Sequence, residues 1–319
     1  MGRLVRNTAI LAKIETTYGT DAAPAGATDA LLISNFSSNP LAANYTDRAL
    51  VRPFLGTSDK LIGYTYKELS FEVEISGSGA AGTAPAWGKL LRACAFAETV
   101  TAGQRVEYNP ISAAFESLTL YYYDDGLLHK LLGARGTVEF KLPIGAKPVM
   151  AFKFTGMDGG DAAAANPSLT LTAWQAPLAV TNTNTGQLTL GCTYATGALS
   201  GGTAYASQGL NANLAGKVVY QELVGLSQVD FTDRDPSGKI VLDLTAAQEV
   251  TLYAAVKAMT KQGLGMTQGT VAGNKFLFFA PAAQLMNPSK NDMNGRRLIG
   301  FDLDLAPLSG NDEMRIVAY

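Results

Sequence analysis

The sequence is short of the side chains on which metal proteins and most hydrolases rely. It contains one histidine, His129, and two cysteines, Cys94 and Cys192, among 319 residues. So few ligands cannot build a zinc site of the usual histidine and cysteine kind, and two cysteines provide no disulfide framework. The sequence therefore predicts no metal site and no disulfide scaffold.

Charge and long apolar runs are also scarce. Charged residues make up 16% of the chain, against about 25% in typical proteins, and 25 basic and 27 acidic residues give a net charge of −2. This balance excludes a strongly basic duplex-binding protein, and 47% apolar residues exclude a disordered polyelectrolyte. No apolar run approaches the ~18 residues of a membrane span, and Lys13 interrupts the apolar start, so we expect a soluble protein without a secretory signal.

Alternation of apolar and polar residues is the dominant pattern. Residues 67–76 (KELSFEVEIS) place Leu, Phe, Val and Ile on one face and Glu and Ser on the other. This is typical of a half-buried antiparallel strand. Thr137–Leu142, Lys239–Leu244 and Leu298–Leu305 alternate in the same way, and the tyrosines of Leu118–Tyr123 favour a further strand. The sequence predicts a mainly β protein.

Helical patterns occur only twice. Pro85–Ala97 carries apolar residues at helical spacing, and Ala246–Gln262 follows a capping box formed by Thr245 and Gln248. Loops are predicted at 20–28, at 49–63 and over most of 156–216, the last with possible strands at 169–173 and 188–194.

The two halves of the chain contain similar landmarks in the same order. YTDR at 45–48 is matched by FTDR at 231–234, and RGTVEFKL at 135–142 is matched by RRLIGFDL at 296–303. The alternating strand, the helix and an aromatic strand also recur, the last as Leu118–Tyr123 and Phe276–Phe279. We therefore predict an internal duplication. The expected parts are a first module at 1–155 with an N-terminal arm and the long loop 49–63, a Gly/Thr-rich connection at 156–209, and a second module at 210–319.

The candidate catalytic and ligand-binding motifs lack their required context. Gly77–Gly82 matches G-x-G-x-x-G, but the preceding strand has an acidic face, unlike the buried strand of a dinucleotide fold, so a flexible turn is expected. Asp233–Gly238 begins like a calcium loop, but Leu244 stands where the bidentate glutamate belongs. Asp158 and Asp161 in a Gly-rich turn show no ligand pattern.

Nucleophilic catalysis and base stacking also find no support. His129 is expected in the link between two strands, and no nucleophile-elbow sequence accompanies it. The run Tyr121–Tyr123 lacks the flanking basic residues of a base-stacking site. The sequence therefore predicts no enzyme and no cofactor, and it favours a structural or binding role.

Several passages resemble the major tail tube proteins of bacteriophages with long, non-contractile tails. They are AILAKIETTYGT at 9–20, the Thr/Gly-rich middle, LMNPSKNDMNGRRLIGFDL at 285–303 and GNDEMRIVAY at 310–319. The resemblance implies two tandem tube modules, each an antiparallel β-sandwich with one flanking α-helix. Copies of the chain are then expected to form stacked rings in the virion tail, and DNA passes through the lumen during ejection.

The same resemblance implies the partners of the chain. They are further copies of itself and other tail proteins, such as the tape measure, tail terminator and distal tail proteins. The chain would be made in the host cytoplasm, bind no membrane and contact DNA only as it passes. The alternative is an immunoglobulin-like or jelly-roll-like binding module on a virion or cell surface, for example one that binds carbohydrate.

A tube for DNA is expected to have an acidic lumen, because each phosphate neutralised by Lys or Arg would slow passage. The outward positions of the alternating strands supply eight acids and one base. These lumen-facing candidates are Glu68, Glu72, Glu74, Glu139, Lys141, Asp230, Asp243, Asp302 and Asp304.

Contact between stacked rings is expected at the long loop 49–63, because a loop of this length in a compact module is usually functional. Its candidates for charge pairing or apolar anchoring are Arg48, Arg52, Phe54, Leu55, Asp59 and Lys60. The N-terminal arm 1–28 is a second candidate. With two modules per chain, the sequence predicts a trimeric ring with pseudo-sixfold symmetry.

Overall fold

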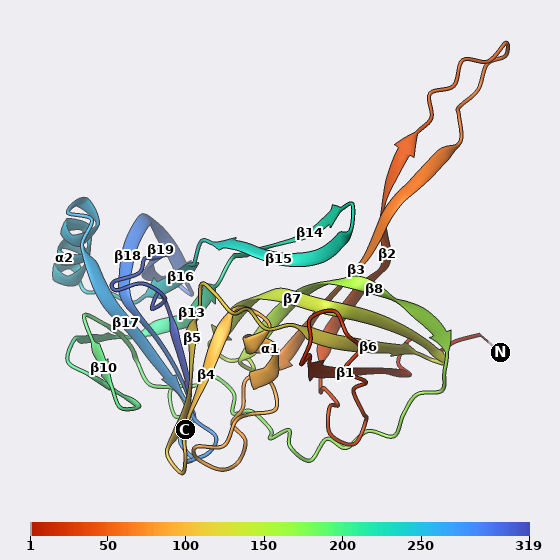
Figure 1. The fold of residues 1–319 in the computed structure, drawn as a ribbon. Coiled ribbons are helices and arrows are strands. Elements are labelled where there is room, and N and C mark those ends of the chain that lie inside the picture. Colours follow the sequence, from red (N-terminus) through yellow and green to blue (C-terminus); the bar gives the residue numbers. More distant parts are fainter. Residues whose placement is uncertain (1) are drawn as a thin grey trace.

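The computed structural model describes residues 2–319 and is built almost entirely of antiparallel strands (Figure 1). The first half contains β1 (Thr8–Ile14), β2 (Ser34–Asp47), β3 (Lys60–Glu74), β4 (Phe96–Thr101), β5 (Arg105–Pro110), β6 (Leu118–Asp124), β7 (Leu127–Pro143) and β8 (Val149–Ala163). Next come the short strands β9 (Leu188–Leu190), β10 (Thr193–Ala195), β11 (Ala198–Ser200) and β12 (Thr203–Tyr205). The remaining strands are β13 (Ser207–Asn213), β14 (Gly216–Leu223), β15 (Leu226–Arg234), β16 (Ser237–Leu242), β17 (Lys261–Gln268), β18 (Phe276–Met293), β19 (Arg296–Leu305) and β20 (Arg315–Ala318).

One sheet runs through both halves of the molecule. Eight consecutive strands follow the order β2-β3-β8-β7-β13-β16-β19-β18. Beyond them, β6 and then β1 pair beside β7, while β17 and then β9 pair beside β18. The order β2-β3-β8-β7-β6-β1 of the first half therefore recurs as β13-β16-β19-β18-β17-β9 in the second half. Along the chain, the strands of the two halves also occupy these six positions in the same order.

The sheet matches the two halves differently from the sequence landmarks. By position β7 corresponds to β18, whereas the landmarks matched residues 135–142 of β7 with 296–303 of β19. The YTDR segment lies at the end of the first strand of its hairpin, and FTDR lies on the second strand of its own. These landmark matches are wrong, because any two half-buried strands share the same period-two pattern.

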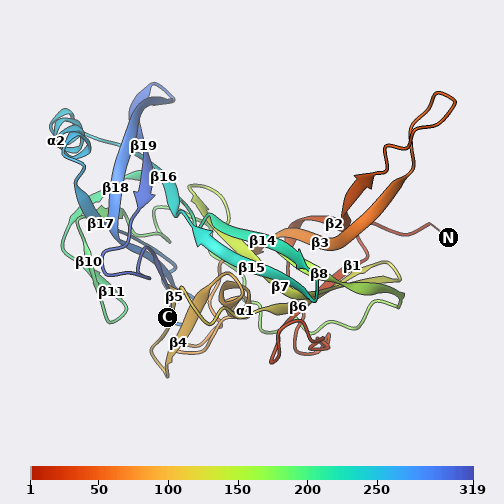
Figure 2. The same ribbon diagram turned by 45° about the horizontal axis from the view of Figure 1, so that its top comes forward.

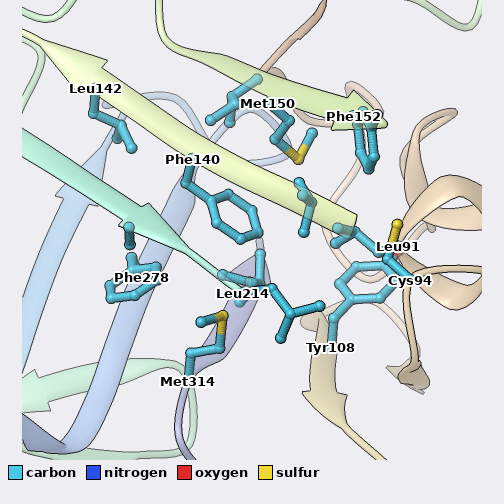
Figure 3. Packing of buried hydrophobic residues seen from close by; sticks show 14 of the residues in the cluster. Leu91, Cys94, Tyr108, Phe140, Leu142, Met150, Phe152, Leu214, Phe278 and Met314 are labelled. Atoms are coloured by element: carbon cyan, nitrogen blue, oxygen red, sulfur yellow. The ribbon is translucent and has the colours of Figure 1, made fainter. Parts of the chain in front are cut away.

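The apolar faces predicted from alternation are confirmed as core. Phe71, Phe140 and Phe301 are all buried, and the rings of Phe140 and Phe278 lie 6.0 Å apart. Figure 3 shows residues of both halves meeting in this cluster, with Leu214 and Met314 close to Phe140. The halves share one core, and the boundaries expected at 155/156 and 209/210 fall inside β8 and β13.

Both helices exist but are shorter than predicted. The first, α1, spans only Gly88–Arg92, because β4 begins at Phe96. The second, α2, spans Ala246–Lys257, and the capping box of Thr245 and Gln248 is present. No strand forms at 169–173. Part of the expected connection belongs to the main sheet, since β8 continues to Ala163 and β13 begins at Ser207, whereas no strand forms between Ala163 and Leu188.

Two hairpin arms leave the sheet at corresponding positions. The first arm consists of residues 40–66, the outer parts of β2 and β3 with their turn, and it projects away from the body (Figures 1 and 2). The second arm, β14–β15, connects β13 to β16 and lies along β7 and β8. The long loop therefore has a counterpart in the second half, and its residues 60–63 belong to β3.

The expected N-terminal arm is only partly free. Residues 8–14 form β1, which pairs with β6, and Ile10, Leu11 and Ala12 are buried. Met1 lies outside the described residues. A strand held in the core by these side chains is not available for contact with another ring.

Candidate functional site

The described chain contains no cluster suited to metal binding. Within residues 2–319, no group of three or more His, Cys, Asp or Glu side chains is placed to hold a metal ion. No helix in this range is long and apolar enough to cross a membrane. The predicted turn at Gly77–Gly82 approaches another backbone closely: a Cβ on Gly77 would lie 1.9 Å from the Gly273 carbonyl oxygen. Close backbone packing, not phosphate binding, explains that glycine.

Rows of directly paired residues cross the sheet from one half to the other. One row runs Glu72, Ala151, Glu139, Asn213, Ser237, Asp304, and the next runs Glu74, Val149, Lys141, Asn211, Lys239, Asp302. Residues directly opposite each other in antiparallel strands point to the same side. Six strands therefore present one continuous face, named here the charged face, and its reverse side carries the core residues.

Seven of the nine lumen candidates lie on the charged face. They are Glu68, Glu72 and Glu74 of β3, Glu139 and Lys141 of β7, and Asp302 and Asp304 of β19. The other two lie elsewhere. Asp230 belongs to β15 in the second arm, with its carboxylate 3.6 Å from Arg135, and Asp243 follows β16, where it accepts a hydrogen bond from Arg296.

The charged face carries more lysines than the sequence reading found. Lys153 of β8 lies 3.4 Å from Glu68, Lys239 of β16 lies 3.5 Å from Asp302, and Lys147 in the β7–β8 turn lies 2.9 Å from Glu74. With Lys141, four lysines accompany six acids. The alternation of Met150, Phe152 and Phe154 marks Lys153 as outward, so its contribution was readable from the sequence.

Lys141 occupies the centre of the charged face. Its Nζ lies 3.2 Å from Glu72 and 3.5 Å from Glu139. Partial burial lowers the pKa of Lys141, but the hydrogen bond to Glu72 and the charge of Glu139 outweigh this effect and raise it. Asn211 of β13 also donates to Glu139 at 2.7 Å. Side chains of both halves thus form one charge network.

The ring-contact candidates gather at the tip of the first arm. Arg48 and Arg52 both pair with Asp59, at 2.7 and 3.1 Å, and so brace the turn from within. Phe54 and Leu55 are exposed, and Lys60 lies opposite Asp47 in the strand ladder at the start of β3. The charges of Arg48, Arg52 and Asp59, which were expected to meet a neighbouring ring, are engaged inside the loop, whereas its apolar side chains are exposed.

An ion cluster around a buried lysine at the base of the first arm was missed. The side chain of Lys67 is fully buried, and its Nζ lies 2.7 Å from both Asp158 and Asp161. His129 lies in β7, not in a link between strands, with Nδ1 2.6 Å from Asp161. Burial raises the pKa of Asp161, but the hydrogen bonds from Lys67 and His129 outweigh burial, so the pKa is lowered overall. The Gly-rich turn expected at 158–161 is instead strand β8.

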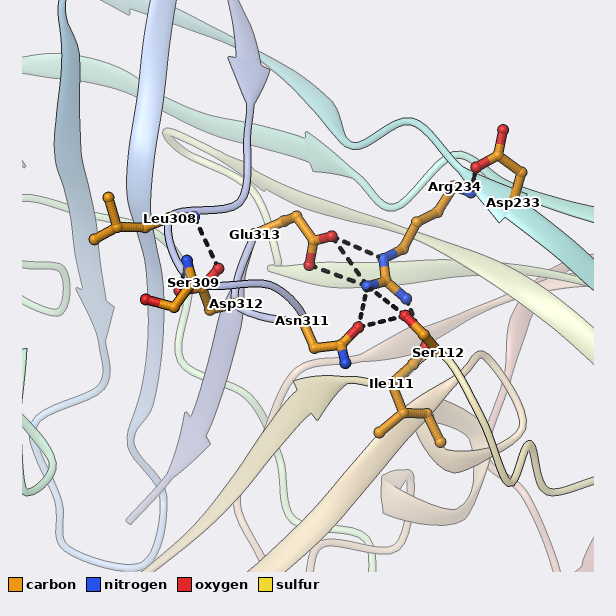
Figure 4. Close-up of polar contacts among 9 residues, drawn as sticks. All are labelled: Ile111, Ser112, Asp233, Arg234, Leu308, Ser309, Asn311, Asp312 and Glu313. Atoms are coloured by element: carbon orange, nitrogen blue, oxygen red, sulfur yellow. Dashed lines mark hydrogen bonds and ion pairs between the residues drawn. The ribbon is translucent and has the colours of Figure 1, made fainter.

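A second missed cluster joins the halves around Arg234 at the end of β15 (Figure 4). The guanidinium pairs with Glu313 at 3.0 Å and donates to Asn311 Oδ1 at 2.7 Å. It also donates to the carbonyl oxygen of Ile111 in the first half. Such a planar donor suits several fixed acceptors at once. Asp233, which opens the motif that begins like a calcium loop, pairs with Lys217 at 2.8 Å.

Comparison with protein families decides the kind of protein. A family model described as phage tail tube protein matches residues 6–314, nearly the whole chain. The chain belongs to the phage tail tube protein family. No curated protein matches it. As a tail tube protein it has a structural role in the virion tail, and the family is of a structural, non-enzymatic kind.

Proposed function

We propose that this tail tube protein assembles into stacked rings that form a continuous tube, and that DNA passes through the tube during ejection. The charged face supports this most directly. It extends across strands of both halves and is covered on its reverse side by the shared core. A sheet with one side committed to the core and one open, hydrated side has the construction required of a tube wall.

The charged face is proposed to line the lumen. Its six acids exceed its four lysines, and each of the four lysines lies within 4 Å of one of those acids. Such a surface offers few free cations to DNA phosphates, so it would not hold the duplex by counterion release. The acidic excess is smaller than the eight-to-one ratio expected from sequence. Low affinity for DNA therefore rests on neutralised lysines as much as on repulsion.

The repeated strand order supports two tube modules in each chain. Each half contributes four consecutive strands, β2-β3-β8-β7 and β13-β16-β19-β18, to one sheet. Three chains then supply 24 strands. At about 4.8 Å spacing and about 40° tilt they close a circle of about 150 Å circumference and about 48 Å backbone diameter. We propose a trimeric ring with pseudo-sixfold symmetry.

Contacts along the tube are proposed at the tip of the first arm. Phe54 and Leu55 are exposed there on a turn braced by Arg48, Arg52 and Asp59. An apolar pair on a rigid turn loses little conformational freedom when it docks. At the ends of the tube the same surfaces would meet other tail proteins, such as the tape measure, tail terminator and distal tail proteins.

Negative-stain microscopy of concentrated purified protein tests the proposed function. We expect rings or tubes with an open channel. Monodisperse monomers at high concentration would contradict tube assembly and favour the alternative, an immunoglobulin-like or jelly-roll-like binding module. That alternative has less support, because most aromatic side chains, such as Phe71, Phe140 and Phe278, lie in the core.

A further inference from the structure

Inside the chain, the two halves of the sheet are joined by one strand pair. Strand β13 of the second half pairs antiparallel with the end of β7 in the first half, from Gly209 opposite Pro143 to Asn213 opposite Glu139. Side chains reinforce this junction, since Asn211 donates to Glu139 at 2.7 Å and the Gly216 amide donates to Thr137 at 2.9 Å.

Strand β2 and the end of strand β18 each have an open edge, and they correspond to the two strands of this junction. By position in the sheet, β2 corresponds to β13, and it ends the sheet, paired only with β3. The end of β18 corresponds to the end of β7. Beyond Gln284, no strand within residues 2–319 pairs with the edge of β18 that faces away from β19. Open edges of this kind readily pair with another chain.

We propose that β2 of one copy pairs with the end of β18 in the next copy, and so repeats between chains the β7–β13 junction found within each chain. This inference rests on the proposed self-assembly and names its contact. The eight-strand sheets of successive copies would then join head to tail into a closed ring, and every contact between them would repeat the strand pairing already present within the chain.

The in-chain junction also gives the register. The paired stretch of β7 begins at Glu139, five residues after Ala134, the last residue paired with β6. Five residues after Gln284, the last residue of β18 paired with β17, is Ser289. Ser289–Met293 is therefore the receiving stretch, and it takes Asn35–Asn39 of β2.

Side-chain orientation supports this register independently. It places Ser37 opposite Asn291, just as Asn211 lies opposite Lys141 within the chain. Ser37 pairs with Ser70, between Glu68 and Glu72, so it points to the charged face. The Asn291 amide flanks Gly300, the neighbour of Asp302 on the same side of β19. A shift of one residue would turn one of the two side chains to the core side.

The first arm has the surface expected of a segment that is covered on assembly. Tyr45, Leu61 and Ile62 are 57%, 55% and 57% exposed. On the second arm, beyond the in-chain junction, Val229 and Phe231 are 0% and 7% exposed, because that arm lies over the first half. Repetition of the junction lays the first arm of one copy over the second half of the next copy.

Disulfide cross-linking tests the contact, because the natural cysteines Cys94 and Cys192 are both buried. In the full chain we expect S37C/N291C to form covalent chains and closed covalent rings between copies on oxidation. Directly opposed residues of paired strands fall within the Cα separation that a disulfide spans. K141C/N211C, the equivalent pair within the chain, is the positive control and gives an intramolecular link.

Two further variants make the result decisive. S37C/K290C moves one cysteine to the opposite side of β18 and should cross-link at least tenfold less. S37C alone should give no dimer, and a dimer would indicate β2-to-β2 pairing and overturn the proposal. Normal tubes without the S37C/N291C link overturn this junction but leave the tube function standing. Chains linked through Ser37 and Asn291 that never form tubes support the junction and contradict the tube function.

Discussion

The two arms of this protein occupy equivalent places in the sheet but have opposite surroundings. The second arm, β14–β15, lies over the first half, and its Val229 backbone exchanges hydrogen bonds with the Tyr18 hydroxyl at 2.6 and 3.4 Å. The first arm extends from the body, with apolar side chains in solvent. The difference follows from position: the second arm lies over the first half, whereas the first arm packs against the second arm at its base, through Tyr64 and Tyr66 beside Tyr220, and projects beyond it.

The comparison explains how a sheet with open ends can be stable before it assembles. The bases of both arms are held by charge: Lys67 between Asp158 and Asp161 at the first, and Arg234 against Glu313 at the second. Apolar side chains are exposed at the tips of both arms, Leu223 and Val224 on the second and Phe54 and Leu55 on the first, but the first arm projects furthest from the body. We therefore expect the chain to fold as a monomer and to keep the first arm available for assembly.

Removal of the tip of the first arm should have the largest effect on assembly. Deletion of Val51–Asp59 leaves three residues between Asp47 and Lys60, which already pair, so the hairpin can still close. We expect complete loss of tubes in electron micrographs, with an unchanged thermal unfolding midpoint. Normal tubes from this deletion would refute a role for the tip in assembly.

Replacement of an aromatic residue by alanine should change the stability of the monomer very differently in the two arms. Phe231→Ala removes a buried ring that packs against Phe115, so we expect about 3–5 kcal/mol lower stability. Tyr45→Ala on the free arm should change stability by less than about 0.5 kcal/mol. Urea unfolding of the two variants measures both, and equal losses would show that the free arm is packed in solution.

Loss of the buried Lys67 should weaken the part of the fold from which the first arm projects. Lys67→Met leaves two partly exposed carboxylates without their shared partner, and we expect about 2–3 kcal/mol lower stability. Lys217→Met, which breaks the exposed pair with Asp233 on the second arm, is the matched control and should leave the stability nearly unchanged. A similar loss in both variants would mean that burial of Lys67 contributes nothing.

Low pH should weaken the ion cluster at the root of the first arm, and the loss of stability should be smallest near neutral pH. The pKa of Asp161 is lowered in the folded chain, so its contribution is present above the unfolded value of about 3.9 and is lost as pH falls through the folded value. Unfolding measured between pH 7 and pH 2.5 should show Asp161→Asn and the unaltered chain converging at low pH. A constant gap between them over this range would contradict the assignment.

Local patterns in the sequence predicted the strands well. Phe71, Phe140 and Phe301 all face the core as alternation requires, and Thr245 caps α2. The charged face was also largely readable, because the same alternation places Glu72 and Asp302 outward. These features depend only on near neighbours in the chain, which is why sequence alone reveals them.

Features that depend on partners distant in the chain were missed or misassigned. Lys67 looks like an ordinary surface lysine until β8 brings Asp158 and Asp161 beside it. The correspondence of β7 with β18 depends on strand pairing, and identical alternation in neighbouring strands hid it. The second arm was overlooked although Val229 and Phe231 alternate with Asp230 and Thr232, because its strands pair only with each other and the fold alone places them over the first half.

The central claim is that both halves of each chain line one lumen in a ring of three copies. A cryo-electron microscopy map of the assembled tube at side-chain resolution tests it most directly. We predict threefold symmetry, with the charged face of both β3 and β19 toward the channel. An exact sixfold ring, in which only one of Glu68–Glu74 and Leu298–Leu305 faces inward, would contradict the claim.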